Sequence, residues 1–169
     1  MGKVTVRPYD SQDLEQCRAL WTELAQCHRD LYGDPSIGGP TPGLQFDDHL
    51  SRVGPECVWI AERQGRAVGM VALLANGDEA EIDPLIVSAK DRGQGIGRAL
   101  LERAKREAAA LGVRYLEVRP VARNRDAISF YYRAGFCLLG RVELFMELQA
   151  SAPDKWAQGP ELFGLPLRH

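Results

Sequence analysis

A glycine-rich turn between an apolar strand and a basic helix is the feature of this chain that most limits how it can fold. Residues 85–87 form an apolar run, and Gly93, Gly95 and Gly97 follow before a helical pattern that starts at Arg98. Glycines let the backbone approach a bound group closely, and the first turn of a helix attracts anions. The pattern therefore predicts an anion site, although a plain turn between a strand and a helix would look similar.

Two familiar phosphate-binding patterns do not match this turn. The Walker pattern requires Gly-Lys-Ser/Thr, but Gly97 is followed by Arg98 and Ala99. The dinucleotide fingerprint is spaced G-x-G-x-x-G in an early βαβ unit, whereas these glycines are each one residue apart and follow several strand-like runs. Both nucleotide-binding folds are therefore excluded.

Hydrophobic periodicity predicts a mixed α/β domain rather than a strict βα alternation. Strands are expected at 4–8, 57–62, 67–74, 80–87, 115–119 and 136–148, and helices at 11–31, 46–53, 98–111 and 124–133. Pro84 cannot donate to a sheet ladder, so it predicts a break in pairing within its strand. We expect one domain over residues 1–149 and a tail over 150–169, with a single short turn near Trp156.

Composition is that of an ordinary soluble protein. The 169 residues are 45% hydrophobic, and no run approaches the roughly 18 apolar residues of a membrane span. We therefore expect a cytoplasmic protein without membrane contact. Cysteines 17, 27, 57 and 137 show no CxxC pair, which favours buried free thiols and no metal site. His28 and His49 have no catalytic neighbour in the sequence.

Charge is divided unevenly along the chain. Residues 90–125 hold ten Lys/Arg and four Asp/Glu, a net charge of +6, whereas residues 1–89 carry a net charge of −7. Random clustering on solvated helix faces would explain this split. A functional interpretation is that one half meets a polyanion and the other half a cation. The overall charge of −2 argues against a nucleic-acid-binding protein.

Two motifs resemble those of the GNAT acetyltransferase superfamily. Residues 92–97, Arg-Gly-Gln-Gly-Ile-Gly, match its cofactor motif Arg/Gln-x-x-Gly-x-Gly/Ala. Further along, the chain matches Asn-x-x-Ala-x-x-Phe/Leu-Tyr-x-x-x-Gly-Phe at Asn124, Ala127, Phe130, Tyr131, Gly135 and Phe136. The resemblance covers residues 3–148. It implies the GNAT fold, a mixed central sheet with a splayed parallel strand pair, flanked by helices.

The resemblance also implies acetyl-CoA as co-substrate. Backbone amides of the first motif would hold the pyrophosphate, namely those of Arg92, Gly93, Gln94, Gly95, Ile96, Gly97 and Arg98. The splayed strand would pair with the pantetheine arm through Leu85, Ile86 and Val87. Asn124 would contact the same arm, and Tyr131 would protonate the departing thiolate.

Acyl transfer to an amine makes these roles chemically reasonable. A tyrosine with a pKa of about 10 is protonated at neutral pH and can donate its proton. The Val87 N–H could stabilise the oxyanion. Glu81 and Asp83 lie two apart on a strand and face one side, so either could accept the amine proton directly or through water, or both could be plain exposed residues. Tyr132 points elsewhere on the helix and is expected in the core.

The sequence thus predicts an acyl-CoA-dependent N-acetyltransferase working by direct transfer, with a small cationic amine as acceptor. The acidic N-terminal half, including Asp34 and Asp47 near the 33–43 loop, would attract that amine. A non-catalytic CoA-binding sensor or scaffold of the same fold is the main alternative, and a structural or nucleic-acid-binding module is the second. A homodimer is one assembly we expect, with the tail packing on a partner subunit or covering the acceptor cleft.

Overall fold

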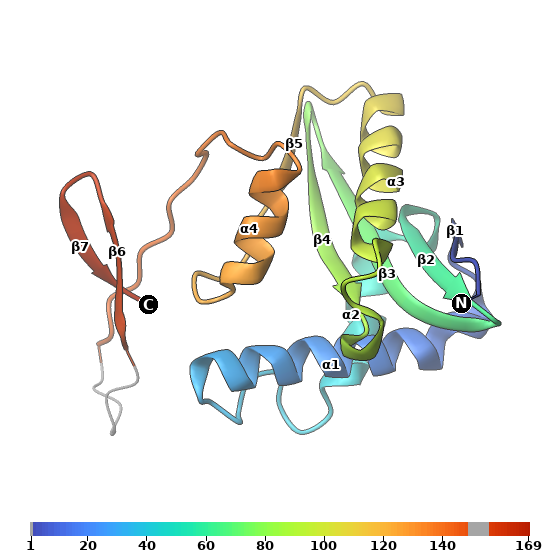
Figure 1. The fold of residues 1–169 in the computed structure, drawn as a ribbon, viewed down its shortest axis with the longest axis horizontal. Helices are drawn as coiled ribbons and strands as arrows, with labels where there is room; N and C mark the ends of the chain where they lie inside the picture. The colour runs from blue at the N-terminus through green and yellow to red at the C-terminus, as the bar shows by residue number, and fades with distance from the viewer. Residues whose placement is uncertain (1, 149–155) are drawn as a thin grey trace.

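A five-stranded sheet forms the centre of the protein (Figure 1), whose computed structural model describes residues 2–148 and 156–169. The strand order is β1-β2-β3-β4-β5. The strands are β1 (Thr5–Pro8), β2 (Val58–Arg63), β3 (Arg66–Asn76), β4 (Glu79–Val87) and β5 (Tyr115–Val118). Neighbours from β1 to β4 are antiparallel, and β4 pairs β5 in parallel. The predicted mixed sheet with one parallel pair is confirmed.

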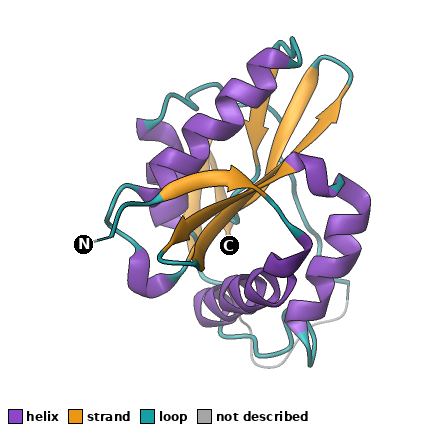
Figure 2. Ribbon diagram, turned by 90° about the vertical axis from the view of Figure 1, so that its right-hand side faces the viewer, coloured by secondary structure: helices purple, strands orange, loops and turns teal. Residues whose placement is uncertain are grey.

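Helices cover both faces of this sheet (Figure 2). The α-helices are α1 (Leu14–Tyr32), α2 (Gln45–Val53), α3 (Ile96–Ala110) and α4 (Arg125–Arg133). Short 3-10 helices are η1 (Ser11–Asp13), η2 (Pro42–Leu44), η3 (Pro55–Cys57) and η4 (Ala89–Asp91). Each predicted helix is present within three residues of its expected start. None of the helices in the described ranges is long and apolar enough to cross a membrane.

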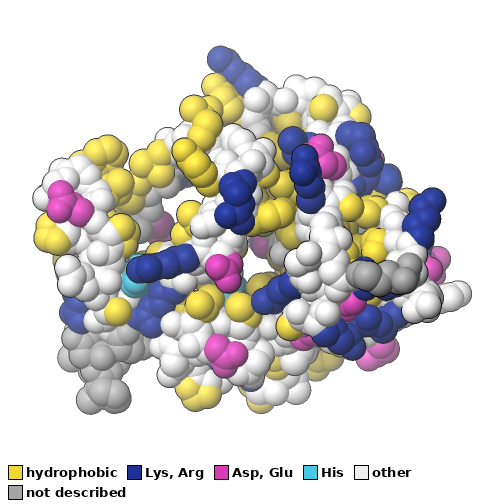
Figure 3. Space-filling view, in the orientation of Figure 1, with side chains coloured by type: hydrophobic (Ala, Val, Ile, Leu, Met, Phe, Trp, Pro, Cys, Tyr) yellow, Lys and Arg dark blue, Asp and Glu magenta, His cyan; other side chains and the backbone are white. Residues whose placement is uncertain are grey.

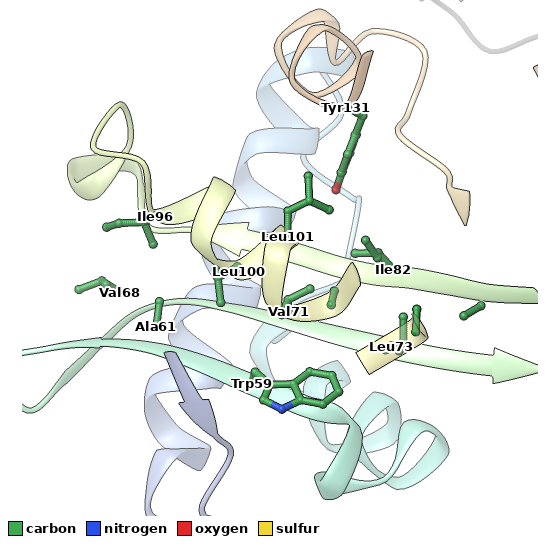
Figure 4. Packing of buried hydrophobic residues seen from close by; sticks show 13 residues of the cluster. Trp59, Ala61, Val68, Val71, Leu73, Ile82, Ile96, Leu100, Leu101 and Tyr131 are labelled. Atoms are coloured by element: carbon green, nitrogen blue, oxygen red, sulfur yellow. The ribbon is translucent and has the colours of Figure 1, made fainter. Parts of the chain in front are cut away.

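The strands bury both of their faces, which gives the protein two core clusters. Val58 and Ile60 of β2 point to the cluster shared with α1 and α2, where Phe46 is fully buried. The next residue in each case, Trp59 and Ala61, points to the cluster shared with α3 and α4 (Figure 4). This two-residue alternation explains why the central strands are almost continuously apolar.

β4 and β5 pair over only part of β4. Their register runs from Glu79 opposite Tyr115 to Ile82 opposite Val118, and there β5 ends. Beyond this point the register between β4 and β3 also shifts, because Asp83 and Pro84 have no partner residue on β3. The break that the proline predicts is therefore confirmed. The second half of β4 keeps β3 on one side and has no strand of the described residues on the other.

The prediction of a strand over 136–148 is wrong. Phe136 packs against the core, but residues 137–148 form no strand and are exposed. The alternation in the sequence is real, but no strand among the described residues pairs with this segment. Cys137 is exposed instead of buried, and Tyr132 is 67% exposed rather than part of the core.

The tail also differs from the prediction of a single turn. Its described part forms a hairpin of β6 (Gln158–Leu162) and β7 (Leu165–Arg168). Phe163 and Gly164 connect the strands with φ values of +53° and +76°, the signature of a tight hairpin turn. A phenylalanine at the first position conceals this turn in the sequence. The boundary expected at 149–150 lies outside the described residues.

Candidate active site

The open edge of β4 is the first component of the site. The Ser88 N–H donates to the Val68 carbonyl at 2.9 Å, and Met70 stands opposite Ile86. The backbone N–H and C=O groups of a strand alternate in direction, so those of Ile86 bond to β3. Those of Leu85 and Val87 point to the opposite edge of β4, along which β5 does not extend. Of the three residues predicted to meet the pantetheine arm, the geometry favours Leu85 and Val87. The Ile86 side chain is buried.

The glycine turn leads from this edge into the first turn of α3. Gly93 and Gly95 have φ values of +72° and +80°, which L side chains rarely adopt, and a Cβ at either would meet no atom within 4 Å. The first helical bond runs from the Ala99 N–H to the Gly95 carbonyl at 3.0 Å. The N–H groups of residues 96–98 therefore have no partner within the helix and add to its positive end. Such a cradle suits a phosphate group.

The turn is held from behind by buried polar contacts. The carboxylate of Glu23, on α1, accepts from the Ser88 hydroxyl at 3.1 Å and from the Ala89 N–H at 2.9 Å. The buried carboxylate of Asp91 accepts from Arg63 at 3.1 Å and from Arg66 at 2.9 Å. The residues after Asp91, from Arg92 to Gly95, are exposed. The result is a fixed base with an accessible rim.

Arg92 places a positive charge at this rim. Several Lys and Arg side chains lie over α3 on the face drawn in Figure 3. The Arg92 Nε donates to the Val87 carbonyl at 3.1 Å, so this residue already lies against the open edge of β4. Lys90, Arg92 and Arg98 belong to the turn or adjoin it, whereas Arg103, Arg114 and Arg123 lie over the rings of Trp59, Tyr115 and Tyr32. Only part of the positive charge predicted from the sequence therefore lies beside the turn.

Tyr131 lies at the other side of the open edge, on α4. Its ring is held between Phe130 and Phe136, with ring centroids 5.1 and 5.6 Å away. Its hydroxyl end points toward the sheet near Leu101 and Ile82 (Figure 4). Burial raises the pKa of Tyr131 to about 12, and the negative charge of Asp83 adds to this effect. The phenol therefore stays protonated through the physiological range.

The start of α4 shows a structural role for Asn124. Its side-chain oxygen accepts from the Ala127 N–H at 3.0 Å and caps the helix. Ala127 is the alanine of the second motif, so the motif spacing places this cap. The cap uses only the oxygen of the amide, and the nitrogen is the group that could meet a ligand.

Both predicted carboxylates lie at the pairing break or close to it, each beside an arginine. Glu81 is 3.2 Å from Arg119, and Asp83 is 3.0 Å from Arg52. Burial raises the pKa of Glu81, while the charge of Arg119 opposes this shift. The charge of Asp83 acts on Tyr131 as well as on Glu81. The carboxylates, the arginines and the tyrosine therefore form one electrostatic group.

His49 joins this group, although it has no catalytic neighbour in the sequence. It is buried on α2, its ring lies 4.8 Å from that of Trp21, and its Nδ1 is 4.0 Å from the Asp83 carboxylate. Arg52 can only donate, so its 3.0 Å contact requires Nδ1 to be an acceptor. Burial lowers the pKa of His49, which agrees with a neutral ring.

The acidic residues around the 33–43 loop are engaged in local structure. Asp47 forms a bidentate pair with Arg18. Asp34 accepts from the backbone N–H and the hydroxyl of Ser36 at 3.0 and 2.5 Å. Their charges are therefore less available to an acceptor than the sequence suggested. Of the two predicted carboxylates, Asp83 lies at the pairing break, whereas Glu81 stands opposite Glu117 in the paired half of β4.

Sequence reasoning missed the arginines and the anchor of this site. Arg52 belongs to α2 and Arg119 follows β5, so only the folded sheet brings them to β4. Glu23 is 65 residues away from Ser88 in the chain. Among these residues only Asp91 could have been found from the sequence, because it is the single acidic residue in the basic stretch from Lys90 to Arg98.

Curated sequence relatives are described as N-acetyltransferases. An uncharacterized N-acetyltransferase, MJ1207 of Methanocaldococcus jannaschii, is 36% identical over 85 residues, which are 46% of this chain and 38% of that protein. The peptidyl-lysine N-acetyltransferase YjaB of Salmonella typhimurium is 26% identical over 143 residues, 83% of this chain and 88% of that protein. The matched part thus spans well under half of the first relative and most of the second.

Solved structures share the fold. The PaiA N-acetyltransferase of Thermoplasma acidophilum, solved in complex with coenzyme A, has a TM-score of 0.65 at 18% identity, over 79% of this chain and 89% of that one. The relatives confirm the predicted class, an acyl-CoA-dependent N-acyltransferase. The model of the acetyltransferase (GNAT) family matches residues 18–136, which include both motifs and most of the sheet. This chain belongs to the acetyltransferase (GNAT) family.

Proposed function

We propose that this protein transfers an acetyl group from acetyl-CoA directly to a primary amine. The observation that supports this best is the open edge of β4, which runs straight into the positive first turn of α3. Leu85 and Val87 would pair with the pantetheine arm, and the N–H groups of residues 96–98 would hold the pyrophosphate. The thioester would then lie near the pairing break.

The residues at the break supply the acid and the base. When bound, acetyl-CoA presents a thioester carbonyl to the amine, and a backbone N–H of the open edge would stabilise the oxyanion, that of Leu85 being nearer to the break than that of Val87. As the carbon–sulfur bond breaks, Tyr131 donates its proton to the leaving thiolate. The proton of the attacking nitrogen passes to Glu81 or Asp83. The raised pKa of Tyr131 keeps the acid in its donating form.

We propose a small cationic amine as the acceptor. Glu81 or Asp83 would take its proton. Each of them pairs with an arginine, as Asp47 does, so the salt dependence described below measures how much attraction for a cation is left. The name of the Salmonella relative, a peptidyl-lysine N-acetyltransferase, offers a second acceptor class, a lysine side chain of a protein. Both acceptors present a primary ammonium group.

The setting of the protein belongs to the same proposal. Free cysteines, two of them partly buried and one exposed, fit a reducing compartment such as the cytoplasm. We also propose a homodimer and treat residues 1–149 as the catalytic domain.

Release of the CoA thiol, measured with a panel of amines, tests the chemistry and the acceptor together. The panel contains polyamines, aminoglycosides, amino acids and lysine peptides. Tyr131→Phe keeps the ring but removes the proton, so turnover should fall by roughly 10²–10⁴-fold with CoA affinity retained. Tyr132→Phe is the matched control, because it removes a hydroxyl from the next, exposed residue.

Each part of the proposal has its own contrary result. Turnover by Tyr131→Phe at the level of the control would assign the proton to another group or to water. CoA binding without turnover of any amine would favour the non-catalytic sensor. A small cationic amine should show a KM that rises with salt, since screening weakens charge attraction. A neutral best acceptor contradicts the acceptor assignment alone.

A further inference from the structure

Three side chains meet at the pairing break of β4, two from α2 and one from β4 itself. His49 and Arg52 belong to α2, and Asp83 belongs to β4. The Arg52 Nη2 lies 3.0 Å from the His49 Nδ1 and 3.0 Å from the Asp83 carboxylate. The guanidinium therefore bridges a buried ring and a carboxylate that is partly open to solvent.

The histidine of this group is held in place and carries a buried donor. Its ring lies 4.8 Å from that of Trp21 on α1. Because Arg52 can only donate, the His49 Nδ1 accepts and its Nε2 carries the proton. Nε2 is buried and has no hydrogen-bond partner among the described residues. An unpaired buried donor is costly, so packing alone does not account for a histidine at this position.

Arg52 depends on this second contact to stay in one geometry. Its side chain is 60% exposed, and an exposed ion pair holds two side chains together only weakly. The hydrogen bond to the His49 ring adds a fixed point on a buried and immobile group. The ring thus limits the positions that Arg52, and through it the Asp83 carboxylate, can take.

Asp83 is the better placed of the two candidate bases. It has no partner residue on β3, whereas Glu81 stands between Leu74 of β3 and Glu117 of β5 in the paired half of β4. The charge of Asp83 also adds to the effect of burial on the pKa of Tyr131. The base and the acid of the reaction are therefore within electrostatic reach of each other.

We propose that His49 is a positioning residue which, through Arg52, holds the Asp83 carboxylate ready to take the proton of the acceptor amine. As the amine nitrogen bonds to the thioester carbon, its proton passes to Asp83. The carbon–sulfur bond then breaks, and the sulfur takes the proton of Tyr131. Asp83 returns its proton to water, to which its side chain is 39% exposed. This role rests on the proposed function, whereas the hydrogen bond between His49 and Arg52 does not.

Two substitutions of the histidine separate its acceptor atom from the rest of the ring. His49→Asn keeps an oxygen acceptor at the place of Nδ1, whereas His49→Gln moves it to the place of Nε2. A misplacement of about 1 Å can cost roughly 10²-fold in rate, so kcat of His49→Gln should fall by roughly 10–10²-fold. CoA affinity should not change, and His49→Asn should keep most of the wild-type kcat. His28→Gln, on α1, is the matched control and should keep all of it.

Arg52→Met tests the same contact at a position where the fold should survive, because the side chain is 60% exposed. Its kcat should fall at least as far as that of His49→Gln. Combining the two substitutions should slow the enzyme no further than Arg52→Met alone, because both remove one contact. Losses that add in the double variant would show that the residues act independently and would overturn the proposal.

Acid should release the carboxylate, because a protonated His49 cannot accept from Arg52. Burial lowers the pKa of His49; the charge and the backbone carbonyl of Asp83 oppose this shift, and the charge of Arg52 adds to it. From α1, the Trp21 ring brings no charge. At saturating amine, kcat should therefore fall below a pH of about 6.5, the ordinary pKa of histidine. This limb should persist in His28→Gln and be absent from His49→Asn.

Nitrogen NMR of the imidazole tests the hydrogen bond itself, with or without turnover. The proposal expects the Nε2–H tautomer in the wild type, in the signal that His49→Asn removes. An Nδ1–H ring, which would donate to Asp83 instead, would overturn the proposal. Wild-type kcat in a folded His49→Gln variant, or equal losses in the Gln and Asn variants, would overturn it as well. If the wild type acetylates no amine, the proposed function fails and the role of Asp83 with it, while the tautomer still shows whether the ring holds Arg52.

Discussion

The turn at residues 88–98 and the segment at 136–148 both carry clear sequence patterns, but the molecule supports them very differently. The turn is fixed by Glu23 from α1, Arg63 from β2 and Arg66 from β3. Behind it, α3 buries Leu100 and Leu101 in the core. The segment beyond Phe136 has a surface ion pair at Arg141 and a row of exposed apolar side chains.

This difference distinguishes a cofactor cradle, which contacts within one chain can hold, from a strand, which needs a pairing partner. A cofactor cradle needs backbone held in a fixed position, and three elements of the same chain provide that. A strand at the edge of a sheet needs a neighbour, and the described part of one chain leaves residues 142–148 without one. The comparison therefore predicts that the cofactor half is complete in a single chain and that the C-terminal half depends on association.

Removing equivalent leucines should show the largest contrast. Leu100→Ala opens a cavity at a fully buried position and should lower the free energy of unfolding by about 2–5 kcal/mol. Leu144→Ala, at a 70% exposed position, should change it by no more than about 0.5 kcal/mol in monomeric protein. Urea unfolding at several protein concentrations measures both.

The concentration series sharpens this comparison. If a second copy covers Leu144, the Leu144→Ala variant should lose stability relative to the wild type as protein concentration rises. A loss as large as that of Leu100→Ala at every concentration would mean that the segment packs within its own chain.

A charge in the cradle should have the next largest effect. Gly95→Asp places a carboxylate where a phosphate is expected, and two unit charges 4 Å apart repel by about 4 kcal/mol at an effective dielectric constant of 20. With some screening, CoA affinity in calorimetry should fall by roughly 10²-fold. Gly77→Asp is the matched control: Gly77 is also a left-handed glycine with open space, φ +64°, in the β3–β4 turn. Equal CoA affinities in the two variants would show that the phosphate does not bind at this turn.

Much of the sheet and the cofactor cradle is predictable from sequence because local chemistry determines both. Gly93 and Gly95 require left-handed backbone, Pro84 breaks a ladder, and α3 repeats apolar residues at helical spacing. The family motifs then place Asn124 and Tyr131 on the following helix. All of these signals lie within about ten residues of the structure they determine.

The remaining features depend on contacts between distant parts of the chain. Arg52 reaches Asp83 only through the packing of α2, and His49 arrives with it. The pairing of Asp47 with Arg18 could not be inferred from either residue alone. The prediction of a strand at 136–148 was wrong because alternating apolar and polar residues show only that a segment is able to form a strand. Forming the strand also requires a neighbouring strand to pair with.

Calorimetric titration of CoA into a Leu144→Asp variant, in which a charge replaces an exposed apolar side chain to oppose association, tests most directly the claim that one chain completes the cofactor site. This account predicts one CoA per chain and an affinity within about twofold of the wild type, since residues 85–98 are held by contacts within their own chain. A tenfold or greater loss of affinity in a folded, monomeric variant would contradict it, because the cradle would then depend on a second copy.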